Sequence, residues 1–296
     1  MVVIRTLLFL YAESPVHAGG DTSVGGLDLP MQRETGTGLP VIWGQSLKGA
    51  LRAHARSTWG PTDPRIVALF GDPPPSGPDT AEVKPGTLSV GDAQLAAFPV
   101  PTLRETFAWA TSPLALGRLR RRAGLVELAG AAPSVSPTAT DDTALAASDS
   151  WIGDRTVLGP YVLPCETDDA ATQWARWLAA TALPDGGDFD YFRAKVRRDL
   201  IVVGDGVLTA LSRECAELTP RIQLHEDRKA VRHGPFHSEY LPAETILAAL
   251  IEAPDGGTAL NDLSSLLAGR VLRVGGDESI GKGLLWCRLT GPGDSP

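Results

Sequence analysis

Apolar residues lie in short runs along the chain, separated by long polar or glycine-rich segments. Residues 2–11 are rich in Val, Ile, Leu and aromatic side chains, which is typical of a buried β-strand. Residues 47–59 have apolar side chains at helical spacing, and Ser46 lies in the first turn of that predicted helix. Further helices are expected at 170–183 and 190–200, and further strands at 95–100, 106–111 and 284–289. The pattern predicts an α+β protein.

Two polar segments interrupt this pattern. Residues 13–40 contain few apolar positions and many glycines, and a loop of this length inside a domain is usually functional. Residues 220–242 have apolar arms on either side of a charged centre, which predicts a projecting β-hairpin.

Composition limits the function classes. The 296 residues are 43% hydrophobic, enough for a packed core, and the formal net charge of −8 disfavours a protein that binds nucleic acid through its overall charge. A local basic face stays open as an interpretation. Because acidic residues cluster in 141–154, 166–169 and 185–190, we expect a polarised molecule with an acidic outer face and a basic groove.

Cysteine usage and hydropathy indicate the compartment. Cys165, Cys215 and Cys287 lie far apart without a CxxC pair, so zinc-ribbon and thioredoxin motifs are excluded. An odd, sparse cysteine count fits a reducing cytoplasm. No apolar run approaches the ~18–20 residues that span a bilayer. We therefore expect a cytoplasmic protein with no membrane partner.

The glycine loop, Gly275–Gly283 (GGDESIGKG), nearly matches a phosphate-binding P-loop from Gly276 onward. Gly283 stands where the motif needs a hydroxyl for magnesium, and the residues that follow read as a strand rather than a helix, which disfavours an NTPase. Glycines still let backbone amides approach a phosphate, and Lys282 adds charge. Gly276, Gly281 and Lys282 are therefore candidate phosphate ligands, although a tight turn between two strands explains the same residues.

A second candidate lies at residues 43–52 (WGQSLKGALR). Lys48 and Arg52 are four residues apart and share one helical face. With Gln45 and Ser46 at the helix start, they form a candidate phosphate cradle. The alternative is an ordinary helix with a solvated basic face.

Taken together, three segments resemble the RAMP superfamily of CRISPR proteins, and within it the backbone subunit of the type III-B effector, the Cmr complex. The segments are Asp28–Glu34 (DLPMQRE), Thr37–Gly49 (TGLPVIWGQSLKG) and the glycine loop. The resemblance covers residues 1–120 and 220–290 and is weak across 120–200.

The resemblance implies a fold. We expect a ferredoxin-like (RRM-like) β-α-β-β-α-β core with inserted loops and a projecting β-hairpin thumb. It implies a single RAMP domain over residues 1–296, with the core at about 1–120 and 243–290, an insertion at about 121–200 and the thumb at about 220–242.

The resemblance also implies partners. Copies of such a subunit stack head to tail along a CRISPR RNA guide, together with other Cmr subunits, and the thumb displaces bases of a complementary target RNA. Three of the five histidines fall within 225–237. Arg228, Lys229 and Arg232 are the RNA-binding candidates on this hairpin, and a plain solvated hairpin is the alternative.

The target-cleaving residue that the resemblance implies is Asp28. It would accept a proton or hold a divalent cation, Mg²⁺ or alternatively Mn²⁺, with RNA phosphates completing the site. His17, Glu239 and Tyr240 are further catalytic candidates. Without the resemblance, Asp28 reads as a turn-capping aspartate, His17 as a hydrogen-bonded loop residue, and Glu239 and Tyr240 as a strand end with one core aromatic.

Three hypotheses follow. The first is a backbone subunit that is a metal-dependent target-RNA endoribonuclease within the assembly. The second is a purely structural, non-catalytic RNA-binding backbone subunit. The third is a separate phosphate-binding enzyme that uses the Gly276–Lys282 loop.

Overall fold

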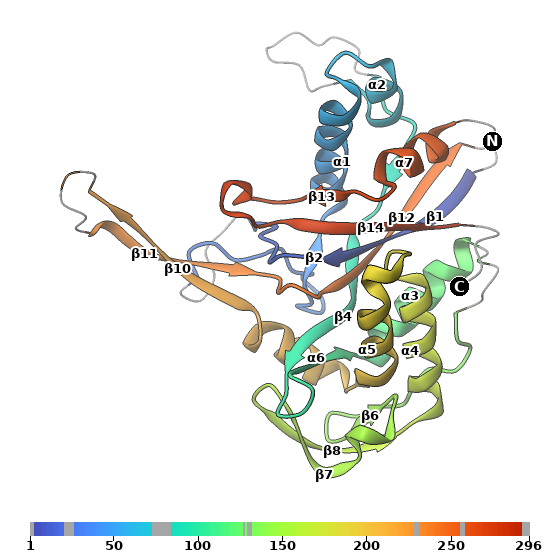
Figure 1. Cartoon of the computed structure of the whole chain (residues 1–296), viewed down its shortest axis with the longest axis vertical. Coiled ribbons are helices and arrows are strands. Elements are labelled where there is room, and N and C mark those ends of the chain that lie inside the picture. The colour runs from blue at the N-terminus through green and yellow to red at the C-terminus, as the bar shows by residue number, and fades with distance from the viewer. Residues whose placement is uncertain are drawn as a thin grey trace.

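A large mixed β-sheet runs through the molecule, with helices on both of its faces and a long hairpin projecting from its body (Figure 1). The computed structural model describes residues 3–20, 27–72, 84–126, 128, 132–225, 227, 231–254 and 258–291. Over these residues the α+β prediction is confirmed.

Within the described residues, twelve strands form one sheet with the path β13-β14-β1-β12-β4-β5-β9-β6-β8-β7, and β2 and β3 pair with β4 and β12. The strands are β1 (Val3–Ala12), β2 (Val41–Ile42), β3 (Ser89–Val90), β4 (Ala93–Pro101), β5 (Phe107–Thr111), β6 (Ala144–Ala146), β7 (Gly153–Leu158), β8 (Tyr161–Thr167), β9 (Leu200–Val202), β12 (Ile246–Pro254), β13 (Val271–Arg273) and β14 (Leu284–Thr290). The hairpin is β10 (Glu217–Leu224) with β11 (Val231–Tyr240), and it confirms the predicted projection.

Helices cover both faces of the sheet. They are α1 (Gly44–Trp59), α2 (Pro64–Phe70), α3 (Pro113–Val126), α4 (Asp169–Thr181), α5 (Asp190–Asp199), α6 (Asp205–Glu214) and α7 (Ala259–Leu267), with short 3₁₀ turns η1 (Asp149–Trp151), η2 (Gly187–Phe189) and η3 (Glu278–Ile280).

The first strand shows why the sheet needs two covered faces. From Leu7 onward its side chains are almost fully buried. Leu8 and Leu10 belong to one hydrophobic cluster and Leu7 and Phe9 to another. Because successive side chains of a strand point to opposite faces, an unbroken apolar run can be buried only where both faces are covered. Helices α1, α2, α6 and α7 contribute to the first cluster and α3, α4 and α5 to the second.

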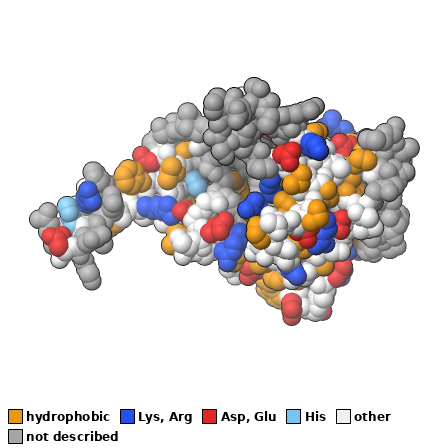
Figure 2. All heavy atoms as spheres, turned by 90° about the horizontal axis from the view of Figure 1, so that it is seen from above, with side chains coloured by type: hydrophobic (Ala, Val, Ile, Leu, Met, Phe, Trp, Pro, Cys, Tyr) orange, Lys and Arg blue, Asp and Glu red, His pale blue; other side chains and the backbone are white. Residues whose placement is uncertain are grey.

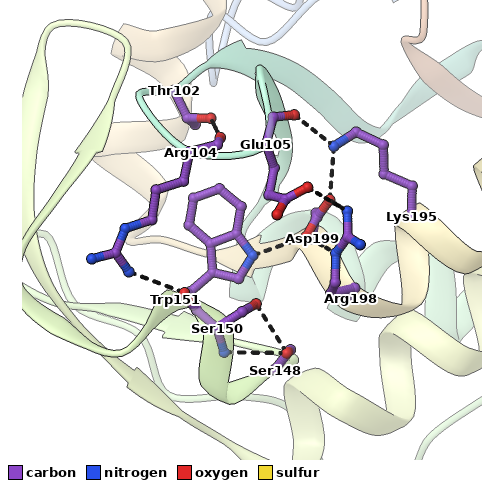
Figure 3. A network of polar contacts seen from close by, with 9 residues as sticks. All are labelled: Thr102, Arg104, Glu105, Ser148, Ser150, Trp151, Lys195, Arg198 and Asp199. Carbon is purple, nitrogen blue, oxygen red and sulfur yellow. Dashed lines mark hydrogen bonds and ion pairs between the residues drawn. The ribbon is translucent and has the colours of Figure 1, made fainter.

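The region predicted as an insertion continues the same sheet through β6, β7, β8 and β9. A network of polar contacts joins it to the β4–β5 turn (Figure 3). Buried Asp199 accepts hydrogen bonds from Lys195 (2.7 Å), Trp151 (3.1 Å) and Arg198 (2.9 Å). Lys195 also donates to the backbone carbonyl of Glu105, a non-glycine residue with φ 58°. The division into core, insertion and thumb stays a prediction.

The predicted start of the first helix needs adjustment. Helix α1 begins at Gly44 rather than Leu47, so Ser46 is the third helical residue and caps no amide at its start. A Cβ at position 44 would meet the carbonyl oxygen of Val90 at 2.3 Å, which explains why this close approach of the helix to β3 requires glycine.

Candidate nucleic-acid interface and nuclease site

The free edge of strand β11 is covered by two pieces of the early polar loop. Val16 and Leu241 exchange both of their backbone hydrogen bonds, at 2.9 Å each. Further along, Leu29 donates to the carbonyl of His237 (3.1 Å) and accepts from the amide of Glu239 (3.0 Å). The early loop and the hairpin, more than 200 residues apart in the sequence, therefore form one continuous surface.

Asp28 lies at this edge. Its Oδ2 accepts a 2.8 Å hydrogen bond from the backbone amide of His237, and the Nδ1 atom of His237 is 3.9 Å from the same oxygen. The two side chains are 46% and 45% exposed. The carboxylate is thus oriented by the hairpin and accessible from solution.

His17 is oriented by the hairpin as well. Its Nδ1 is 2.8 Å from the carbonyl oxygen of Glu239, and its ring lies 5.3 Å from that of Tyr240. Because a carbonyl can only accept, Nδ1 is the donor, and a neutral imidazole then carries its lone pair on Nε2. The backbone carbonyl of His17 also accepts from the amide of Gly276 (3.0 Å), which joins the early loop to the glycine loop.

Glu239 is buried, and both of its carboxylate oxygens have partners. Oε1 pairs with the guanidinium of Arg33 at 2.6 Å, and Oε2 accepts from the amide of Met31 at 3.1 Å. Arg33 in turn donates to Gly38 and Ser212. This geometry favours the structural interpretation, in which Glu239 fixes the early loop against the hairpin.

The glycine loop contacts the face of the hairpin that carries Glu217, Arg221 and Tyr240. These residues share a face because Glu217 pairs with Tyr240 and Arg221 is four positions further along β10. The Tyr240 hydroxyl donates to Asp277 Oδ2 (2.8 Å), and Arg221 pairs with Asp277 Oδ1 (2.5 Å). Lys282 pairs with Glu217 (2.8 Å) and lies 4.9 Å from the Tyr240 ring centre.

The titration properties of Asp277 and Tyr240 follow from these contacts. Burial raises the pKa of Asp277, but the hydrogen bonds from Tyr240 and Arg221 outweigh it, so the pKa of Asp277 lies below its ordinary value. Burial, followed by the neighbouring Asp277 carboxylate, raises the pKa of Tyr240. The carboxylate is therefore held ionised and the phenol neutral, which preserves the hydrogen bond between them.

Acidic and basic side chains lie side by side at the hairpin base. Figure 2 shows Lys and Arg side chains beside Asp and Glu where the hairpin leaves the body. Lys282, Arg221 and Arg33 each form an ion pair with a carboxylate of the same chain. The net charge of the chain does not predict the local charge at the hairpin base, because oppositely charged residues from distant segments meet there.

The start of α1 is tied to the early loop by Gln32. Its amide nitrogen donates to the carbonyl of Gly19 (3.1 Å) and to Ser46 Oγ (3.2 Å), and its oxygen accepts from the Trp43 amide (2.8 Å). Gln45 is exposed in the same turn. Ser46 is thus held beside the early loop, and Gln45 lies next to it on α1.

Lys48 and Arg52 point to different partners from those of the hairpin base. Lys48 donates to the carbonyl of Leu88 (2.9 Å), and Arg52 donates to that of Asp72 (3.3 Å). Burial lowers the pKa of Lys48, and the Arg52 cation lowers it further. The structure brings these two residues together, but their side-chain hydrogen bonds do not join them to Lys282.

Arg228 and Lys229 lie outside the described residues, and Arg232 is exposed on β11. Gly281 has φ 79° and ends η3, while Gly276 donates to His17. Arg221, Gln32, Arg33 and Asp277 were not singled out from the sequence. The signal that could have identified these residues is that they are polar or charged and lie in, or next to, the early motif, the hairpin or the glycine loop.

A groove of about 780 Å³ runs beside the early loop and the hairpin base. It is lined by Gly20, Leu27, Pro30, Met31, Gln32, Arg33, Glu34, Thr35, Gly38, Trp43, Arg213, Leu218 and Glu239. Its mixture of apolar, aromatic and charged side chains suits a ligand with planar rings and charged groups.

Two further findings concern metals and membranes. Among the described side chains, no group of three or more His, Cys, Asp and Glu is arranged to hold a metal ion. Across the same part of the chain, none of the helices has the length and apolarity needed to cross a membrane.

The glycine loop is followed by strand β14, as the sequence predicted, and not by the helix that a P-loop requires.

Residues 9–286 match the RAMP superfamily model, and the chain belongs to the RAMP superfamily. A curated relative, "CRISPR system Cmr endoribonuclease Cmr4" of Pyrococcus furiosus, is 32% identical over 287 residues, which cover 94% of this chain and 93% of the relative. The resemblance to the type III-B group that the early and late motifs indicated is thereby confirmed.

Solved structures agree. A crystal structure of oligomeric Cmr4 from Pyrococcus furiosus superposes with a TM-score of 0.73 at 26% identity and covers 97% of both chains. A chain of the type III-B Cmr-beta complex bound to cognate target RNA superposes with a TM-score of 0.71 at 20% identity and also covers 97% of both chains. The second likeness shows the shared fold.

Proposed function

We propose that this protein is the guide-binding backbone subunit of a type III-B CRISPR effector and that it cleaves complementary target RNA within the assembled complex. The observation that carries the proposal is the exposed Asp28 carboxylate, held by the His237 amide at the edge of a projecting hairpin. The relative named an endoribonuclease supports the reaction class.

The proposed chemistry is cleavage by the target's own 2′-hydroxyl. Its oxygen attacks the adjacent phosphorus, the bond to the 5′-oxygen breaks, and that oxygen takes a proton from water. The products carry a 2′,3′-cyclic phosphate and a 5′-hydroxyl. This route needs in-line geometry, which the hairpin would impose by displacing bases, and a group that accepts the 2′-hydroxyl proton. Asp28 and the Nε2 atom of His17 are the candidates for that acceptor.

The donor set fits a metal only in part. Asp28 supplies one carboxylate, and among the described residues it belongs to no group of three or more His, Cys, Asp and Glu side chains that could hold a metal ion. Magnesium typically takes one or two carboxylates, with waters and substrate phosphates as its other ligands. We therefore propose a hydrated Mg²⁺, or alternatively Mn²⁺, that Asp28 holds together with RNA phosphates. When bound, it would neutralise charge on the phosphate.

The proposed partners are a CRISPR RNA, a complementary target RNA, other Cmr subunits and further copies of this chain stacked head to tail. A relative solved as an oligomer and a complex solved with target RNA support these partners. Guide binding would use the start of α1 and the glycine loop, namely Gln45, Ser46, Lys48, Arg52, Gly276, Gly281 and Lys282, together with Arg228, Lys229 and Arg232 of the hairpin.

The test uses reconstituted complexes carrying Asp28→Ala. We expect loss of target cutting with unchanged guide and target binding. Asp154→Ala, an exposed carboxylate on β7, is the matched control and should cut at the wild-type rate. Full cutting by the Asp28→Ala complex would favour the alternative of a non-catalytic RNA-binding backbone subunit.

A further inference from the structure

Four consecutive residues of β11, 237–240, are held from two directions by loops that lie at opposite ends of the sequence. From the edge, Asp28 accepts from the His237 amide, and Leu29 pairs with the backbone beside it. Across the face, the Tyr240 hydroxyl donates to Asp277. One short stretch of strand therefore connects the proposed nuclease loop to the glycine loop.

Asp277 is the centre of the second attachment. One of its oxygens accepts from Tyr240 of β11 at 2.8 Å, and the other pairs with Arg221 of β10 at 2.5 Å. It therefore bridges both strands of the hairpin. Its side chain is only 17% exposed, so this charged bridge is partly shielded from water and salt.

The backbone at Asp277 is unusual. The residue has φ 68°, in the left-handed region that non-glycine residues seldom adopt. Its carbonyl accepts from the amides of Ile280 (3.1 Å) and Lys282 (3.3 Å), so the loop folds around it. A strained position with both side-chain oxygens engaged indicates that the orientation of this carboxylate is specified by the fold.

We infer that Asp277 is a positioning residue for target cleavage, acting through Tyr240 and strand β11 on the placement of Asp28; this inference rests on the proposed function. The glycine loop would hold the guide while β11 holds Asp28, and Asp277 sets the distance and angle between them. Tyr240 then works as the connecting group, because its hydroxyl hydrogen is directed to Asp277 rather than to RNA.

The test measures single-turnover cleavage at saturating target RNA in reconstituted complexes. Asp277→Ala removes both contacts, and Tyr240→Phe removes one hydroxyl from an otherwise unchanged ring. Because misplacing a reacting group by about 1 Å can cost on the order of 100-fold, we expect each variant to cleave about 10- to 100-fold more slowly. Guide occupancy and target affinity should equal those of the wild type.

The double variant Asp277→Ala/Tyr240→Phe distinguishes positioning from direct catalysis. If the hydroxyl acts only through Asp277, the double variant cleaves at the rate of Asp277→Ala alone. A further loss in the double variant would assign Tyr240 a direct role and overturn the inference. Asp277→Asn tolerates the left-handed backbone and keeps an oxygen for Tyr240, so it should cleave faster than Asp277→Ala.

Glu166→Gln is the charge control, because it removes one exposed negative charge from strand β8, outside the hairpin and the glycine loop. It should cleave at the wild-type rate. Wild-type cleavage by Asp277→Ala, or loss of guide from that complex, would overturn the inference while leaving the proposed function intact. Full cleavage by Asp28→Ala would instead remove the proposed function itself, so the two failures are distinguishable.

Discussion

The Oδ2 atom of Asp28 accepts a 2.8 Å hydrogen bond from the backbone amide of His237, across 209 positions of sequence. Because the donor is a main-chain group, no substitution at position 237 other than proline removes it. The position of Asp28 is therefore a property of the β11 backbone, and variants that change how the hairpin is attached should change cleavage without touching Asp28.

Lys282 pairs with Glu217 in this structure and is proposed to contact a phosphate of the guide, which gives a prediction about guide binding. Lys282→Ala should weaken guide affinity and reduce the slope of log affinity against log salt by about 1, because one phosphate contact is lost. Lys84→Ala, an exposed lysine preceding β3, should leave the slope unchanged. Titrations of the guide at several salt concentrations measure both. An unchanged slope for Lys282→Ala would remove this lysine from the interface.

Glu239 gives a stability prediction. Glu239→Gln leaves the Arg33 guanidinium, 17% exposed, without its ionic partner, and losing one member of a buried pair costs about 3 kcal/mol. Thermal or denaturant unfolding should show this loss. The double variant Glu239→Gln/Arg33→Met should recover part of the stability. Abolished cleavage at unchanged stability in Glu239→Gln would instead indicate a catalytic carboxylate.

The buried pair of Lys195 and Asp199 should make stability depend on acid pH. Burial raises the pKa of Asp199, but hydrogen bonds from Arg198, Lys195 and Trp151 outweigh it and lower the pKa. A carboxyl whose pKa is lower when folded stabilises the protein above its unfolded pKa of about 3.9 and loses that contribution as pH falls through the folded value. The free energy of unfolding should therefore decrease when the pH is lowered beneath about 4.

Asp199→Asn removes this contribution and leaves the buried Lys195 ammonium without its carboxylate partner, so it should destabilise the protein at pH 7 by about 3–5 kcal/mol. Asp185→Asn is the control, since the Asp185 carboxylate is 85% exposed and pairs with Arg288 at the surface. It should change stability by about 0–1 kcal/mol. Urea unfolding at pH 7 and pH 3 measures both, and equal effects of the two variants would contradict the prediction.

Glu244 should give stability the opposite dependence on pH from that of Asp199. Burial raises its pKa to about 7, and Oε2 has no hydrogen-bond partner among the described residues. The unfolded chain loses this proton near pH 4.3 but the folded chain keeps it until about pH 7, so stability falls as pH rises between these values. Glu244→Gln should therefore raise Tm more at pH 8 than at pH 4.5, whereas exposed Glu166→Gln should not. An equal Tm gain at both pH values would contradict this.

The local sequence pattern was enough to predict several of the helices and strands. The apolar run of β1, the helical spacing of α1 and the polar centre between β10 and β11 were legible because side-chain periodicity and turn chemistry act over a few residues. The same local pattern identified the glycine loop as a candidate phosphate-binding segment. Asp28 and His17 became candidates only through the resemblance to the RAMP superfamily.

The contacts that define the site could not be predicted from the local sequence pattern. Asp28 meets His237, Arg33 meets Glu239, and Asp277 meets Tyr240, and each pair is joined across dozens to hundreds of residues. Their meeting depends on the register of β11 against β10 and on which loops cover its edge, and both are set by packing of the whole sheet. Composition and spacing specify the strands and the reactive side chains, whereas the partners of those side chains exist only once the chain has folded.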